Sequence, residues 1–338
     1  MPRLIARQRL ITHSSAKGGI SMASHGSAPS SGLTIEATPP RTGRKVGLRA
    51  RSSGWIFVGP TVILLLLLTI FPLIFSFALS FSNVSQDNGL TFGAATLANW
   101  RQLFADPQFW SSLLFTIIFV VVSLTAEFFL GLGLALLLWR RIPGGGFFRV
   151  LFSIPMMLAP VSIGFMWRML YDQSYGPIDS ILRALGLGAV PWLSQGTVAV
   201  IAVIIMDIWE WTPFMFLLLL AGLQALPGEA LEAAQLDGAT GFRIVRSVVF
   251  PMLAPISVMA IFLRFIEAFT IFGQLYLLTG GGPGTATTST TLFAFFQGFQ
   301  DFNVSYGSTI AIALLVIVTV IALLYLSITR RILQRVEA

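Results

Sequence analysis

Six charged side chains lie inside long apolar segments of the sequence, where insertion of a charge costs about 2.5–3.5 kcal/mol. They are Glu127, Arg168, Asp207, Glu210, Arg264 and Glu267. Asp207 and Glu210 are three residues apart, as are Arg264 and Glu267, so on helices each pair shares a face. Carboxylates accept hydrogen bonds from hydroxyl groups, and a guanidinium donates to hydroxyls or grips an anionic group. These residue types could therefore bind a polar solute.

All of these charges except Arg168 lie near the middle of their segments, at similar depth. Arg168 is nearer a segment end, where its side chain can reach toward the surface. Trp209 and Trp211 flank Glu210 and can stack on the apolar face of a sugar. We interpret seven residues as lining a pathway for a hydrophilic solute: Glu127, Asp207, Trp209, Glu210, Trp211, Arg264 and Glu267. Two alternatives remain open: Arg264 only pairs with Glu267, and Glu210 only braces a subunit interface.

The apolar segments themselves predict an integral membrane protein. Hydrophobic residues make up 55% of the 338 residues and charged residues only 10%, whereas soluble domains carry about 25% charged residues. A helix needs about 20 apolar residues to cross a bilayer. We expect an all-α bundle of six such spans: Trp55–Phe81, Ser111–Trp139, Phe148–Tyr171, Thr197–Leu223, Pro251–Leu278 and Ser305–Thr329. Prolines 72, 155, 160 and 213 lie inside spans and predict kinks.

Basic residues predict the orientation of the spans. Seventeen of the 21 Lys and Arg residues fall in the N-terminal segment, in the loops after the second and fourth spans, and in the C-terminal tail. The opposite side carries two, Arg101 and Arg183. By the positive-inside rule, both termini are cytoplasmic. The net charge of +7 is thereby explained as a topology signal, and we expect no nucleic-acid partner.

The sequence divides into a membrane domain and two tails. Residues 1–53 are rich in Ser, Gly, Thr and Pro and predict a disordered, basic cytoplasmic tail without a secretory signal. Residues 54–330 form the predicted membrane domain, and residues 331–338 a short cytoplasmic tail. Met22 is an alternative start of the chain.

Some chemistries are missing from the sequence. It contains no cysteine, and its two histidines, His13 and His25, both fall in the predicted tail. We therefore expect no metal site and no catalytic site. The phosphate-binding pattern Gly-x-x-x-x-Gly-Lys-Ser/Thr is also absent, so the chain is not expected to bind a nucleotide through such a loop.

A cytoplasmic stretch between the fourth and fifth spans, residues 226–255, predicts two short helices broken at a glycine. Pro227 and Glu229 suit the first turn of one helix, and Gly238 permits the backbone conformation that ends it. A second short helix, about Thr240–Val249, is expected to lead to Pro251, where the fifth span starts. The two helices would form an elbow on the cytoplasmic surface that a soluble partner can grip.

This stretch resembles the EAA loop of permease subunits of binding-protein-dependent ABC importers. The matching residues are Glu232, Ala233, Ala234, Asp237, Gly238, Ala239 and Phe242, followed by Pro251 and Pro255. In that family the loop docks into a cleft of a cytosolic ATPase, which couples ATP-driven closure to movement of the spans. The resemblance implies a six-helix importer bundle in a bacterial inner membrane, and a transport subunit whose partner ATPase dimer binds ATP and magnesium.

Two further stretches extend the resemblance to the sugar-type subclass, which includes maltose and glycerol-phosphate permeases. Trp209–Pro213 with Ala221–Gln224 precedes the loop, and Leu278–Gly284 lies outside, between the fifth and sixth spans. The resemblance implies a second, different permease subunit and an extracytoplasmic substrate-binding protein, with contacts expected at Gly281, Gly282, Pro283 and Gly284. Alternatively, this Gly-Pro segment is only a flexible connector. The implied solute is a sugar, a polyol or a glycerol-phosphate derivative.

Two other classes of function stay open on the residues alone. In an ion-coupled secondary transporter or a channel, the intramembrane acids would relay protons or coordinate ions. An intramembrane enzyme would need a nucleophile and a base, and no recognisable set is present. The EAA-type elbow has no evident role in either class.

Overall fold

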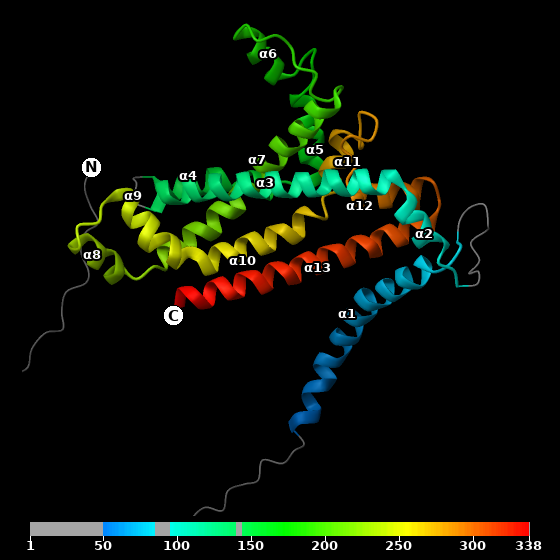
Figure 1. Cartoon of the computed structure of the whole chain (residues 1–338), viewed down its shortest axis with the longest axis horizontal. Helices are drawn as coiled ribbons and strands as arrows, with labels where there is room; N and C mark the ends of the chain where they lie inside the picture. Colours follow the sequence, from blue (N-terminus) through cyan, green and yellow to red (C-terminus); the bar gives the residue numbers. More distant parts are fainter. Residues whose placement is uncertain (1–49, 85–94, 140–143, 338) are drawn as a thin grey trace, which may run out of the picture. The chain divides into compact units, whose positions relative to one another are not determined.

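The computed structural model describes residues 50–84, 95–139 and 144–337 of the chain, and every regular element in these ranges is helical. The predicted N-terminal tail lies almost wholly outside them. The chain divides into two compact units, Met1–Val58 and Gly59–Ala338. In the first unit the structure describes only the beginning of helix α1 (Ala50–Ser80). All other helices belong to the second unit (Figure 1).

Five of the six predicted spans are confirmed as helices long and apolar enough to cross a membrane, within the described ranges. They are Val58–Ser80 of α1, α3 (Pro107–Trp139), α7 (Gly196–Gln224), the helical path Gly241–Ala268, and Val304–Arg330 of α13 (Val304–Glu337). Pro72 and Pro213 lie inside α1 and α7, which continue through them.

The third predicted span is wrong as a single helix. The segment consists of α4 (Gly145–Ser153), the short 3₁₀ helix η1 (Pro155–Met157) and α5 (Pro160–Leu170). Both breaks fall at prolines, which lack the N–H that a continuous helix needs. Ala159 is extended, with φ −67° and ψ 136°, as expected for a residue before proline. A hydropathy pattern reads through such a break, because the side chains remain apolar on both sides of it.

The fifth predicted span, Pro251–Leu278, has different boundaries in the structure. Its helix begins earlier, with α9 (Gly241–Ile244) and the π-helical turn η2 (Val245–Val249), and runs without a break into α10 (Phe250–Ala268). Pro251 directly follows the π-helical turn η2 and therefore lies inside the continuous helix. The helix ends at Ala268, and α11 (Gly273–Leu278) follows as a separate short helix.

Shorter helices connect the spans. They are α2 (Ala98–Ala105), α6 (Pro177–Ala184), α8 (Gly228–Leu236), α12 (Thr290–Phe295) and the π-helical turn η3 (Phe296–Gln300).

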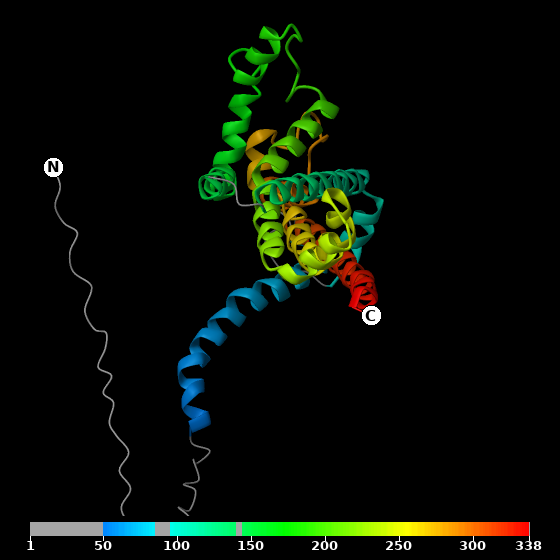
Figure 2. The same ribbon diagram turned by 90° about the vertical axis from the view of Figure 1, so that its left-hand side faces the viewer.

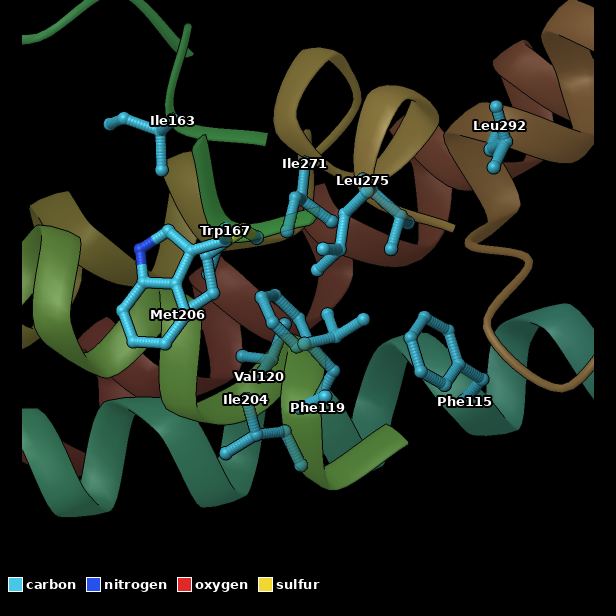
Figure 3. Packing of buried hydrophobic residues seen from close by; sticks show 14 of the residues in the cluster. Phe115, Phe119, Val120, Ile163, Trp167, Ile204, Met206, Ile271, Leu275 and Leu292 are labelled. Carbon is cyan, nitrogen blue, oxygen red and sulfur yellow. The ribbon is translucent and has the colours of Figure 1, made fainter. Parts of the chain in front are cut away.

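The centre of the second unit is the packing of α3, α7 and α10. A Cβ atom on Gly131 of α3 would lie 2.6 Å from the Cβ of Met215 in α7, so these two helices touch at backbone distance. α10 packs against α3, α7 and α13 (Figure 1, Figure 2). An apolar cluster joins α3 and α7 to α5 and α11; Figure 3 shows part of it, including Phe119, Met206 and Leu275. These contacts fix the helices that carry the intramembrane charges.

Candidate solute pathway

Arg264, on α10, is the centre of a buried ion-pair cluster. Its side chain is 1% exposed, and its Nε and Nη2 atoms donate to the two carboxylate oxygens of Glu127, on α3, at 2.8 and 3.0 Å. Glu127 is itself fully buried. Two parallel bonds between a guanidinium and a carboxylate are among the stronger charge-assisted contacts in proteins. The pair therefore ties α3 to α10 in the interior.

Two more carboxylates complete the cluster. Arg264 Nη2 donates to Asp207 Oδ2, on α7, at 2.6 Å, and Asp207 is 1% exposed. Arg264 Nη1 pairs with Glu267, one turn further along α10. The Glu267 side chain is 39% exposed, in contrast to the other two acids. The open alternative that Arg264 only pairs with Glu267 is therefore wrong, since the guanidinium bonds acids from three helices.

The two tryptophans of the predicted site have different surroundings. The ring of Trp211 lies beside the cluster, with its centroid 4.6 Å from Arg264 Cζ, in cation–π geometry. Trp209 instead packs edge-to-face on Trp167, at 5.6 Å between ring centroids, against the apolar cluster of α5 and α7. Trp211 is thus placed with the charged residues, and Trp209 with the apolar core.

Glu210 lies on α7 one turn after Asp207 and is 2% exposed. It accepts a hydrogen bond from Gln274 Nε2, on α11, at 3.3 Å. Gln274 is itself 4% exposed. Gln274 is not among the site residues predicted from the sequence, because a neutral amide in an apolar segment gives a weaker signal than a charge.

Arg168, at the end of α5, is exposed as expected for a residue near a segment end, and its Nη1 donates to the carbonyl of Leu277 at 3.4 Å. It lies outside the ion-pair cluster, since none of the bonds of Arg264 described above involves it.

The segment that resembles an EAA loop carries its matching residues on α8 and the turn after it. Gly238 has φ +79°, a left-handed conformation that ends the helix and favours glycine. Leu236 and Phe242 are 89% and 77% exposed, although both are large and apolar. Glu232, Ala233, Asp237 and Gly238 are exposed as well, and Ala234 and Ala239 are half-buried. The expected second short helix does not end before Pro251, because the helix is continuous from Gly241 to Ala268.

The external Gly-Pro segment is held by its own hydrogen bonds. The hydroxyl of Thr287, fully buried, donates to the carbonyl of Gly282 at 2.7 Å and lies in hydrogen-bond contact with Thr279 Oγ1 at 2.8 Å. Thr288 donates to the carbonyl of Gly281 at 3.1 Å. Gly281 is buried, and Gly282 and Pro283 are half-buried; Gly284 is exposed at the tip. The segment is therefore a loop with several internal hydrogen bonds.

Comparison with known proteins assigns the chain to a protein family. Residues 127–338 match the family model described as "Binding-protein-dependent transport system inner membrane component". The chain belongs to this family. The permease is 36% identical over 291 residues to the trehalose/maltose transport system permease protein MalF of Thermococcus litoralis, with 85% of this chain and 96% of the relative covered. It is 34% identical to the sn-glycerol-3-phosphate transport system permease protein UgpA of Agrobacterium fabrum, with 80% and 91% covered.

The fold agrees with this assignment. A bacterial ABC transporter that imports the acidic polysaccharide alginate contains a chain that superposes on the permease with a TM-score of 0.73, at 21% identity. The superposition covers 84% of the permease and 98% of that chain. The permease is thus a multi-pass inner-membrane transport subunit with the ABC importer fold. Its relatives are not ion-coupled transporters, so that alternative is not supported.

Proposed function

We propose that the permease imports a sugar or a related polar solute, and that the solute passes the face of α7 and α10 that carries the Arg264 cluster. The single observation that carries the proposal is the ion-pair cluster, which joins α3, α7 and α10 inside the membrane domain. Charged groups at membrane depth usually face a cavity or a pathway. Glu267, half-exposed, is the carboxylate of the cluster within reach of a solute.

The names of the relatives support a polar solute but leave its charge open. Trehalose and maltose are neutral, whereas sn-glycerol 3-phosphate is an anion. A solved relative was crystallised with a periplasmic protein that holds an alginate pentasaccharide. By analogy, an extracytoplasmic binding protein delivers the solute, and the exposed tip of the 278–284 loop, at Gly284, is the proposed point of contact, with Gly281, Gly282 and Pro283 shaping it.

We propose further that ATP and magnesium are bound by a cytosolic ATPase dimer and that a second permease subunit completes the pathway. Exposed Leu236 and Phe242 give the α8 elbow an apolar surface suited to a soluble partner. Closure of the ATPase would pull this elbow, and because α9 continues into α10, the movement would reach Arg264 through one helix. The membrane domain would then alternate between outward-open and inward-open states, with both termini in the cytoplasm.

The coupling role is tested at Gly238. The left-handed backbone there excludes proline, whose φ is fixed near −65°. In purified complexes with binding protein, we expect Gly238→Pro to abolish the stimulation of ATPase activity. Gly228→Ala, at the first residue of α8, is the control, since an added Cβ there meets open space and φ is not positive. If no ATPase accompanies the wild-type chain in mild detergent, or if both variants retain full stimulation, the coupling proposal fails.

A further inference from the structure

We infer that the pathway discriminates by charge: the Arg264 cluster admits neutral or cationic polyhydroxylated solutes and disfavours anions, with Glu267 as the specificity-determining residue. The inference rests on the proposed function, because it assumes that a solute passes this cluster. It adds the charge of the solute, which the relatives leave open.

The guanidinium of Arg264 has no free pair of N–H donors for an anionic solute. Of its five N–H donors, Nε and both hydrogens of Nη2 are used by Glu127 and Asp207, and one hydrogen of Nη1 by Glu267, which leaves a single N–H. Trp211 lies over one face of the group, and the side chain is 1% exposed. An arginine that grips a phosphate or a sulfonate needs a free pair of donors. Arg264 here serves instead to hold three carboxylates.

The groups around this arginine are acidic in balance. Three carboxyl groups contact Arg264, and Glu210 lies one turn from Asp207 on the same face of α7. Four acidic side chains thus stand against one guanidinium. In a poorly solvated interior, such an excess acts on a passing charge far more strongly than it would in water. An anion would meet repulsion at the half-exposed Glu267.

Two buried polar groups near the cluster have no hydrogen-bond partner within the described residues. Ser123 is fully buried, its hydroxyl has no hydrogen-bond partner within the described protein, and it lies one helical turn before Glu127 on the same face of α3. The indole N–H of Trp211, against the guanidinium, is likewise buried without an acceptor. Buried polar groups are normally paired. The hydroxyls of a polyhydroxylated solute would donate to the half-exposed carboxylate of Glu267.

Because the chain contains no cysteine, the local potential can be measured with single introduced thiols. Thr270 is exposed, and its Oγ1 bonds the carbonyl of Glu267 at 2.8 Å, so Thr270→Cys reports on the cluster with a side chain of similar size. Thr285→Cys, on the exposed tip of the external loop, is the reference, since residues 279–290 carry no charge. The probes are a cationic trimethylammonium-ethyl methanethiosulfonate and an anionic sulfonatoethyl methanethiosulfonate of similar size.

We expect the ratio of the cationic to the anionic reaction rate to be about tenfold higher at Thr270→Cys than at Thr285→Cys, in the assembled complex at low salt. Adding Glu267→Gln should bring the ratio toward the reference value. Adding Glu229→Gln, which neutralises an exposed acid on α8, should leave the ratio unchanged. Those results would support charge selection by Glu267.

The contrary outcomes separate the two proposals. If both reagents modify Thr270→Cys with the reference ratio, the pathway is accessible but the charge rule is overturned. The same holds if the ratio is high and Glu267→Gln leaves it unaltered. If neither reagent reacts at this position with or without ATP, the pathway assignment itself fails, and the charge rule with it.

Discussion

Replacing Arg264 by methionine would remove the only cation from a site that holds two fully buried carboxylates. Methionine keeps the length and the apolar stem, so the packing against Trp211 is disturbed little. Glu127 and Asp207, at 0% and 1% exposure, would lose their partner, whereas Glu267 can remain solvated. Leaving a buried charge without its partner costs about 3–5 kcal/mol. We expect a loss of that size in the free energy of unfolding.

Unfolding in mixed detergent micelles with increasing sodium dodecyl sulfate measures this quantity. Arg168→Met is the matched control, because Arg168 is exposed and makes one long bond to a backbone carbonyl; its cost should stay below about 1 kcal/mol. Adding Glu127→Gln to Arg264→Met should recover part of the loss, since residues in one buried network are coupled by about 0.5–3 kcal/mol.

Equal costs for Arg264→Met and Arg168→Met would refute the reasoning, because they would mean that the cluster is not a buried, mutually dependent network. Strict additivity of Arg264→Met and Glu127→Gln would refute the bidentate pair in particular.

Two further predictions concern glycines at close contacts. Gly131→Val should destabilise the permease by about 1–3 kcal/mol, since a Cβ there would meet Met215 at 2.6 Å. Gly133→Val is the control, because a Cβ at Gly133 meets open space. It should cost much less in the same unfolding titration with sodium dodecyl sulfate. Gly281→Ala should disorder the external loop, because φ is +88° and a Cβ would lie 2.7 Å from Thr288 Oγ1. Gly284→Ala has a positive φ as well, +61°, but its Cβ meets open space, so it controls for backbone strain. In limited proteolysis of the folded complex, cleavage should rise more for Gly281→Ala than for Gly284→Ala, and equal cleavage would contradict the predicted clash.

The sequence predicts which charged residues form the site better than it predicts which of them bond to one another. Spacing of three residues correctly places Arg264 and Glu267 on one face, and the ion pair forms. The bond to Glu127, 137 residues away, depends on how α3 meets α10, and helix periodicity carries no information about that. Trp209 and Trp211 both flank Glu210 in the sequence, but on a helix adjacent residues point about 100° apart, so sequence proximity does not predict which of them lies beside Arg264.

The fold, too, is predicted in part from the sequence and depends in part on tertiary contacts. Long apolar runs predict α3, α7 and α13 closely, because hydrophobic length alone decides whether a helix can span. Pro155 and Pro160 predict a disturbed helix, yet a kink and a complete break have the same sequence signal. Which of the two occurs depends on whether neighbouring groups satisfy the freed backbone atoms, and that is a property of the tertiary structure.

The broken segment of α4, η1 and α5 decides whether the chain crosses the membrane an odd or an even number of times. The described ranges contain five continuous helices of spanning length, and an odd number of crossings puts the two ends of a chain in different compartments. The proposed arrangement, with both ends in the cytoplasm, needs an even number. The remaining crossing must then be made by α4, η1 and α5 together, in two pieces joined through the extended backbone at Ala159. Whether the C-terminus lies in the cytoplasm would thus depend on α4, η1 and α5, which do not form one of the five continuous helices.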